Sequence, residues 1–141
     1  MKGKVLTFYM GGSLFGIDIL AVKEINRNIE YTAVPDAPPH VSGLLNMRGQ
    51  VVTLFNLAGL MGYESSDKGL PSCIILKNSH ENPYFVGFFI DKPGSVLDID
   101  EDNCEPAPAN MSLAENKFVS EVVKLESGLL MIINYVAIFE Q

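Results

Sequence analysis

Short apolar stretches separated by turn-forming residues recur along the whole chain, and this pattern constrains the fold more than any other feature. Runs of this kind, rich in β-branched and aromatic residues and bounded by Gly, Pro, Asn, Asp or Lys, are typical of strands in barrels and sandwiches. We therefore predict an all-β fold with about ten strands. The candidate strands cover residues 4–10, 14–17, 29–34, 44–47, 50–55, 72–77, 84–91, 95–99, 118–125 and 129–135.

The segments between these runs indicate turns, two short helices and two loops. Paired glycines at 11 and 12 predict a tight hairpin, since glycine readily adopts the positive φ angles such a turn needs. Short helices are expected over 18–26, where Asp18 would cap the first turn, and over 57–62. The proline-rich segment 35–39 is expected to connect two substructures, and residues 101–116 to form a long surface loop.

Length, hydropathy and charge narrow the possible partners. The 141 residues, 48% of them hydrophobic, are enough for one domain or two tightly joined small ones. No segment approaches the roughly 20 apolar residues of a bilayer span, and the N-terminus lacks a signal peptide's apolar core, so we expect a cytoplasmic protein without direct membrane insertion. The net charge of −7 and the presence of only two arginines argue against nucleic acid as a partner.

Motifs for catalysis, cofactors or metals are missing. The thiols and imidazoles of the chain are Cys73, Cys104, His40 and His80, and neither a CxxC pair nor a Cys/His pair stands in a recognisable context. No GxSxG elbow or phosphate-binding glycine loop occurs. The acidic run 98–102 resembles the start of a calcium loop, but Asn103 and Ala109 stand where glycine and glutamate are required. We therefore expect no enzyme activity, no cofactor and no metal.

A charged pair is predicted near the first helix. On a helix over 18–26, the apolar residues of one face are Ile17, Leu20, Ala21 and Ile25, and Glu24 falls among them. A carboxylate buried alone would cost several kcal/mol, so a cationic partner is expected, and Arg48 is the natural candidate. The alternative is two unrelated surface charges. Ile19 and Val22 would point away from that face, indicating either a docking surface or a second covering layer.

Three blocks of the sequence resemble the CheW family of bacterial chemotaxis. They are FGIDILAVKEI at 15–25, VPDAP at 34–38 and GLLNMRGQVV at 43–52, the last followed by Leu54 and Asn56-Leu57. Weaker similarity continues through VGFFID at 86–91, PAP at 106–108 and LLMIIN at 129–134, so that it covers essentially the whole chain. Thr53, Asn56 and Pro93 depart from the residues that are usual in the family.

The resemblance implies one CheW-like domain over residues 1–141, folded as two intertwined five-stranded SH3-like β-barrels with one or two short helices. The barrels would comprise residues 16–80 and residues 1–15 with 81–141. Family members are non-enzymatic adaptors that are recruited to chemoreceptor arrays. They couple the cytoplasmic tip of the chemoreceptors to the regulatory domain of the histidine kinase CheA.

Six positions match the family's binding motifs. Val22, Glu24 and Ile25 match the segment that contacts receptors, whereas Gly43, Arg48 and Gly49 match the motif that lines a groove between the barrels. Two other readings stay open: a piece of a longer CheA or CheV-type protein, against which Met1 and the short tail argue, and a small ligand-binding β-barrel. Kinase-binding residues are not assigned by the sequence.

Overall fold

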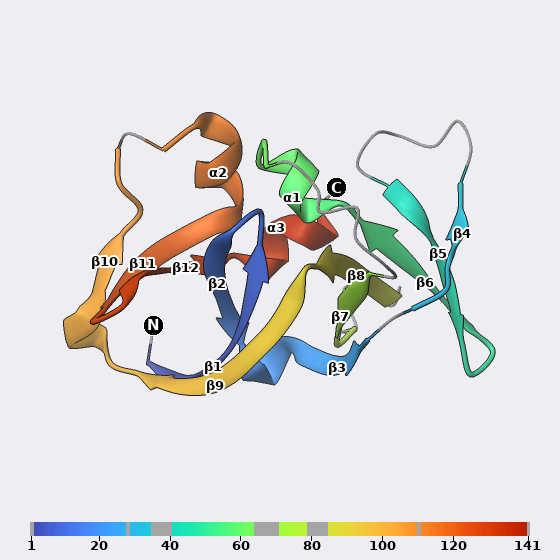
Figure 1. Cartoon of the computed structure of the whole chain (residues 1–141), viewed down its shortest axis with the longest axis horizontal. Helices are drawn as coiled ribbons and strands as arrows, with labels where there is room; N and C mark the ends of the chain where they lie inside the picture. The colour runs from blue at the N-terminus through green and yellow to red at the C-terminus, as the bar shows by residue number, and fades with distance from the viewer. Residues whose placement is uncertain are drawn as a thin grey trace.

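The computed structural model describes residues 2–27, 29–34, 41–63, 71–78, 85–109 and 111–140. Within them the chain forms two six-stranded sheets and several short helices. The sheets lie side by side along the long axis of the molecule (Figure 1). The predicted all-β fold class is therefore confirmed. Each sheet has six strands where five were expected, because Val22–Asn26, expected to be helical, and Cys104–Pro106, expected to lie in a loop, each add one strand.

The first sheet, here called the terminal sheet, is built from both ends of the chain in the order β10-β11-β12-β2-β1-β9. Its strands are β1 (Gly3–Met10), β2 (Ser13–Asp18), β9 (Lys92–Ile99), β10 (Cys104–Pro106), β11 (Val119–Leu125) and β12 (Gly128–Ile133). Neighbours are antiparallel except β12 and β2, which pair in parallel. The predicted hairpin between β1 and β2 is confirmed, with φ of 57° at Gly11 and 81° at Gly12.

The second sheet, here called the middle sheet, has the order β3-β7-β8-β6-β5-β4. Its strands are β3 (Val22–Asn26), β4 (Thr32–Ala33), β5 (Val41–Met47), β6 (Gln50–Phe55), β7 (Ser72–Leu76) and β8 (Phe85–Ile90). The chain leaves the terminal sheet after β2 and returns to it at β9, so the sheets divide the sequence near residues 20 and 91. The predicted barrel boundaries at 16 and 80 differ from this division, because β2 continues to Asp18 in the terminal sheet and β8 pairs with β6 and β7 in the middle sheet. The barrel assignment itself stays a prediction.

Helical segments are short: η1 (Ile19–Ala21), α1 (Leu57–Leu60), η2 (Glu101–Asn103), α2 (Leu113–Phe118) and α3 (Tyr135–Phe139). The helix expected at 57–62 is confirmed, but the loop expected at 101–116 contains η2, β10 and α2. The sequence held a signal for α2, because Ser112 and Glu115 have the spacing of a capping box. No described helix is long and apolar enough for a bilayer span. The proline-rich segment 35–39 and both histidines lie outside the described residues.

Three apolar layers fill the molecule, because the central strands bury both of their faces. Strand β7 shows the principle: Cys73 and Ile75 pack with the interior of the middle sheet, whereas Ile74 and Leu76 pack into a layer shared with the terminal sheet. Side chains alternate between the faces of a strand, so an uninterrupted apolar run serves two layers at once. This explains why the apolar stretches of the sequence are continuous rather than alternating.

The shared layer joins the two sheets. Phe8 of β1 stacks on Phe15 of β2 with ring centroids 6.0 Å apart, and it meets Phe88 of β8 at 5.5 Å. Helices α1 and α3 lie near the middle of the molecule, between the two sheets (Figure 1). Leu57 of α1 and Ile138 of α3 are buried in the same layer. A separate cluster fills the terminal sheet, with Val5, Ile99, Val123, Leu130 and Ile132 buried in it. The halves are therefore packed through one common core and not merely tethered.

The two cysteines differ in their surroundings, and their reactivity should differ accordingly. Cys73 is fully buried, and this burial raises the pKa of its thiol from 9.0 to about 11. A hydrogen bond with the Asn26 backbone lowers the pKa in part, and the nearby Glu24 carboxylate raises it further. Cys104 is half-buried, and its Sγ donates to the Asp100 carbonyl at 3.3 Å. At pH 8 we expect a disulfide reagent to modify Cys104 on the order of 100-fold faster than Cys73.

A Cys104→Ser variant isolates the slow thiol. Because the pKa of Cys73 is raised in the folded state, the stability that this group contributes is complete below pH 9 and is lost as the pH rises through about 11. Denaturant titrations at pH 8 and at pH 11 measure that loss, with Cys73→Ala as the control that lacks it. Rapid modification of the Cys104→Ser variant at pH 8 under native conditions would contradict the assignment.

Candidate protein-binding site

The segment from β2 to β3 is one 3₁₀ turn followed by a strand. The Asp18 carboxylate accepts a hydrogen bond from the Leu20 amide at 3.0 Å, as the predicted cap requires, but the helical turn already ends at Ala21. The helix predicted over 18–26 is therefore wrong. Residues 22–26 pair with β7, with a bulge between Val22 and Glu24, and this pairing favours the extended form of the β-branched Val22 and Ile25.

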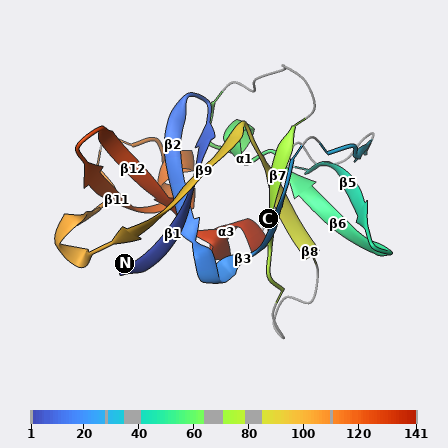
Figure 2. The same ribbon diagram turned by 60° about the horizontal axis from the view of Figure 1, so that its bottom comes forward.

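Strand geometry also changes which side chains reach solvent. Val22 and Ile25 are partly buried against the shared layer, as is Ile19. Of the two alternatives for Ile19 and Val22, the structure therefore shows the covering layer and not an exposed docking surface. Leu20, expected on the core side of a helix, is 74% exposed. The turned view brings η1 and β3 forward, with β3 running beside β7 (Figure 2). The apolar group that this segment offers to a partner is therefore Leu20.

The turn between β5 and β6 presents Arg48 and Gly49. Their φ angles are 52° and 81°, and Met47 pairs with Gln50 across the turn. Positive φ at both central positions is the geometry of a two-residue type I′ hairpin, which matches the twist of the strands that it joins. Gly49 suits its position, whereas Arg48 is the only described residue other than glycine with a positive φ.

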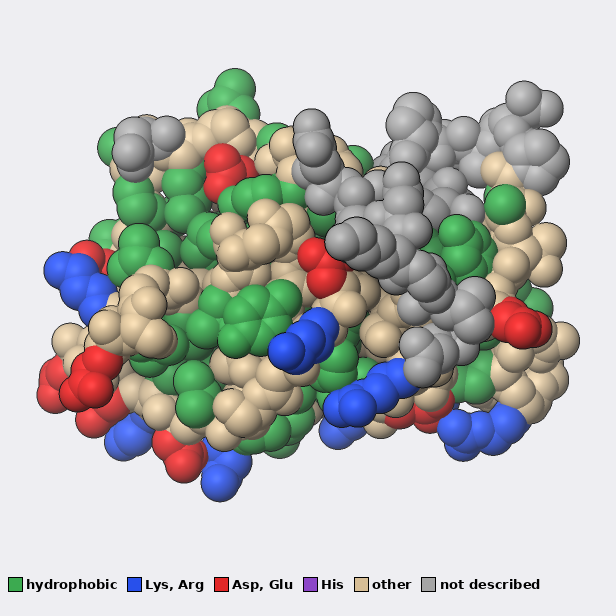
Figure 3. Space-filling model, in the orientation of Figure 1, with side chains coloured by type: hydrophobic (Ala, Val, Ile, Leu, Met, Phe, Trp, Pro, Cys, Tyr) green, Lys and Arg blue, Asp and Glu red, His purple; other side chains and the backbone are tan. Residues whose placement is uncertain are grey.

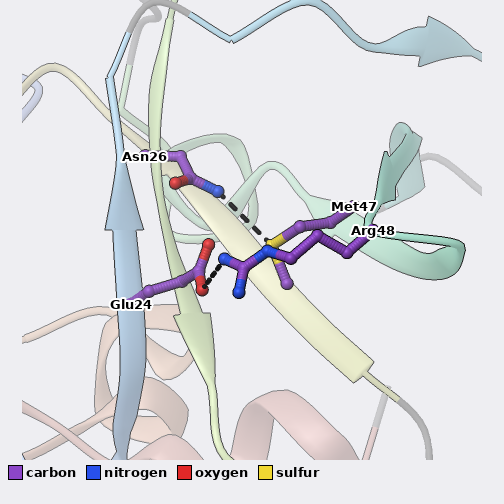
Figure 4. Close-up of polar contacts among 4 residues, drawn as sticks. All are labelled: Glu24, Asn26, Met47 and Arg48. Carbon is purple, nitrogen blue, oxygen red and sulfur yellow. Dashed lines mark hydrogen bonds and ion pairs between the residues drawn. The ribbon is translucent and has the colours of Figure 1, made fainter.

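An ion pair connects this turn with β3. Arg48 Nη2 donates to Glu24 Oε2 at 2.8 Å (Figure 4). Two residues further along β3, Asn26 Nδ2 donates to Met47 Sδ at 3.6 Å. In the hydrogen-bonded order of the middle sheet, β3 stands at one end and β5 is next to the other end. These side-chain contacts therefore bring β3 together with the end of β5, two strands that share no ladder.

The predicted pairing of Glu24 with Arg48 is present, but its expected burial is wrong. The side chain of Arg48 is 74% exposed and that of Glu24 is 20% exposed. An exposed guanidinium keeps most of its hydration, so this pair contributes at most about 1 kcal/mol to stability. The burial expectation failed because it placed Glu24 on the core face of a helix that does not form.

Gly43 lies apart from the other predicted site residues. It pairs with Ala33 and Leu54, near the opposite end of β5 from Arg48. A Cβ built on Gly43 would lie 2.4 Å from Tyr31 Cδ2 and 2.7 Å from the Thr32 carbonyl oxygen. The structure thus brings Val22, Glu24, Ile25, Arg48 and Gly49 to one region and leaves Gly43 making room for the Tyr31 ring. The groove between barrels stays a prediction.

Charge is distributed unevenly over the surface. Acidic side chains gather at the β9–β10 end of the terminal sheet, at the lower left of Figure 3. The exposed acids of that end are Asp98, Asp100, Glu101, Asp102 and Glu105. Lys4 pairs with Asp98 at 3.7 Å and Lys124 with Glu105 at 2.9 Å. In the described part of the chain, no three His, Cys, Asp or Glu side chains are grouped as a metal site would need.

Two six-stranded sheets packed over a shared apolar layer define a small all-β domain of the paired, SH3-like class. The family model of the CheW-like domain matches residues 4–141. The chain therefore belongs to the CheW family of chemotaxis proteins, as the sequence blocks predict.

Individual relatives and a solved structure agree with this membership. The chain is 25% identical to a probable chemotaxis protein CheW of Rhizobium etli, over 98% of this chain and 88% of that protein. It is 27% identical to the chemotaxis protein CheW of Bacillus subtilis, over 98% and 87%. The crystal structure of the scaffolding protein TtCheW from Thermoanaerobacter tengcongensis superposes with a TM-score of 0.81 at 26% identity, covering 95% of this chain and 85% of that one.

Substitutions at Arg48 separate the ion pair from the backbone geometry of the turn. Arg48→Ala removes the pair and keeps a side chain at positive φ, so we expect a loss of at most about 1 kcal/mol in the free energy of unfolding. Arg48→Gly also removes the pair but relieves a conformation that costs about 1–2 kcal/mol for other residues, and it should be as stable as the parent protein or slightly more stable. Denaturant titration measures both values.

Glu24→Gln is the matched control, because it removes one charge of the pair and leaves the turn untouched. It should resemble Arg48→Ala. A loss of about 3–5 kcal/mol in either variant would be the signature of a buried pair and would contradict the exposed geometry.

Proposed function

We propose that this protein is a non-enzymatic adaptor that couples chemoreceptors to the histidine kinase CheA in bacterial chemotaxis. The observation that carries the proposal is family membership over nearly the whole chain, together with the likeness to a solved scaffolding protein. The adaptor would act in the cytoplasm, where the tips of chemoreceptors and the kinase are found, and it would be recruited to receptor arrays.

The physical task of such an adaptor is to hold two partners in a defined geometry. A coupler contributes a coupling free energy between its two binding sites, and it needs no reacting groups. A body whose halves share one apolar core suits this task, because displacement of one surface is transmitted to the other. This argument supports an adaptor more than a ligand-binding barrel, whose interior would have to be hollow. Among the described residues, apolar side chains pack into the interior of each sheet.

The receptor-facing surface is proposed at η1, β3 and the β5–β6 turn. This region contains Val22, Glu24 and Ile25, which match the receptor-contacting segment of the family, and Arg48 and Gly49 from the neighbouring motif. Leu20 adds an exposed apolar side chain beside them. An amphipathic helix from a receptor tip would cover Leu20 and place polar groups near Arg48, which is the usual way in which a helix docks on a protein surface.

Binding experiments with purified partners test the proposal. The full chain is mixed with a cytoplasmic-tip fragment of a chemoreceptor, with the regulatory domain of CheA, or with both, and the complexes are separated by size. We expect each binary complex and a ternary complex. In receptor-containing vesicles, the chain should also raise the autophosphorylation rate of full-length CheA. Absence of binding to both fragments would contradict the proposed function.

A pair of leucine substitutions tests the location of the receptor surface. Leu20 is 74% exposed and Leu129 of β12 is 54% exposed, so aspartate at either position should change the melting temperature little. If a receptor helix covers Leu20, Leu20→Asp should weaken receptor binding by about tenfold or more, because burying a leucine side chain is worth about 1.5–3 kcal/mol.

Leu129→Asp introduces the same change on the other sheet and should leave receptor binding within about twofold of the parent value. Equal effects of the two substitutions, or no effect of Leu20→Asp, would contradict a receptor surface at η1 and β3. Neither result would bear on whether the chain binds CheA.

A further inference from the structure

Tyr63 is a point where the middle-sheet part of the chain reaches across to the terminal sheet. It follows α1, between β6 and β7, and its amide donates to the Ala58 carbonyl at 2.9 Å, which ends the helical segment. Its phenol oxygen donates to Glu115 Oε2 at 3.0 Å, in the helix that precedes β11. Its ring meets Phe15 of β2 edge-on, with centroids 5.8 Å apart and planes at 90°.

The acceptor of this hydrogen bond is held in place by its own helix. Ser112 Oγ accepts from the Glu115 amide at 3.1 Å and donates to Glu115 Oε1 at 3.2 Å. One carboxylate oxygen is thus bound within α2, and the other is left for Tyr63. Since the carboxylate has a fixed position, the bond to Tyr63 specifies a direction as well as a contact.

The β1–β2 turn is fitted around the same tyrosine. A Cβ built on Gly11 would lie 2.7 Å from Tyr63 Cβ, so the ring occupies the space that any other residue at position 11 would need. From the junction of β8 and β9, Asp91 Oδ2 accepts from the Gly11 amide at 2.9 Å. The turn is therefore held between Tyr63 and the point where the chain crosses from the middle sheet to the terminal sheet.

The hydrophobic effect that holds the two sheets together is itself non-directional, so a hydrogen bond between them adds a directional constraint to their packing. The contacts of Tyr63 add a directional bond and a closely fitted ring at the edge of the shared layer. We propose that Tyr63, through its bond to Glu115 and its seat on Gly11, is a positioning residue that fixes the orientation of the terminal sheet relative to the middle sheet. If the protein has the function proposed above, this orientation in turn sets the coupling between receptor binding and kinase binding.

Residual dipolar couplings of the free, full-length protein test the first part of the proposal without any partner. In the parent protein, the amides of both sheets should fit one alignment tensor with the geometry described above. Tyr63→Phe keeps the ring but loses the hydrogen bonds of the phenol with Glu115 and Ser13, and Glu115→Ala removes the Glu115 acceptor alone. In either variant the two sheets should require different tensors, whereas Glu115→Gln, which retains an acceptor oxygen, should behave as the parent does.

A glycine pair gives a matched test of the ring's seat. Gly11 and Gly12 both have positive φ, so alanine is strained at either position, but only a Cβ at position 11 meets Tyr63; nothing lies within 4 Å of one at position 12. Gly11→Ala should therefore rotate the sheets relative to each other, and Gly12→Ala should not. A single parental tensor in Tyr63→Phe, Glu115→Ala and Gly11→Ala would overturn the proposal.

Binding linkage tests the second part. The dissociation constant of the receptor-tip fragment is measured alone and with saturating CheA regulatory domain, and the ratio of the two gives the coupling factor, typically about 5–150. In Tyr63→Phe this ratio should fall towards one while both separate affinities stay within about twofold. The Tyr63→Phe/Glu115→Ala double variant should show no further fall, because both changes remove the same bond.

These outcomes keep the two proposals apart. Failure of the parent protein to bind either fragment counts against the proposed function, and the dipolar couplings still decide whether Tyr63 orients the sheets. An unchanged ratio in Tyr63→Phe, or an equal loss in both separate affinities, overturns the role of Tyr63 in coupling.

Discussion

The apolar layer shared by the two sheets is the constraint on which the rest of the structure depends. Strands β1, β7, β8 and β12 place alternate side chains into this layer and into the interior of their own sheet, so separating the two sheets would expose the apolar side chains of the shared layer. A slip of one residue in any of these strands would exchange the two sets of side chains. The continuous apolar runs of the sequence are the consequence of serving two cores at once.

The surface features follow from this arrangement. In the middle sheet no backbone ladder joins β3 to β5, so the Arg48–Glu24 pair and the Asn26–Met47 contact connect β3 with the β5–β6 turn through side chains. The same region displays Leu20 to solvent. On the opposite flank of the shared layer, Tyr63 and Glu115 join the sheets with a directional bond. A coupler needs such a body, since two partners bound to independently moving halves would exert little influence on each other.

Much of this was readable from the sequence because strand burial leaves a strong pattern. The runs that became β1, β6, β7 and β8 are apolar enough to be recognised without knowledge of their partners. The residues after Asp18 are ambiguous in the sequence, because a cap followed by apolar residues fits a helix as well as a turn, and only pairing with the distant β7 decides for a strand. Opposite charge correctly predicted Arg48 as the partner of Glu24. The predicted burial of the pair was wrong, because it rested on a helix over 18–26 that does not form. The positive φ of Arg48 belongs to the local two-residue turn between β5 and β6. The close fit of Tyr63 against Gly11 arises instead from a tertiary contact that no local pattern shows.

Native-state hydrogen exchange tests most directly whether the two sheets form one cooperative body. If they share a core, the slowest amides of β1 and β12 in the terminal sheet and of β7 and β8 in the middle sheet should exchange only through global unfolding. Their opening free energies would then agree with each other and with the value from denaturant titration. A terminal or middle sheet that opens as a unit several kcal/mol below the global value would contradict the account.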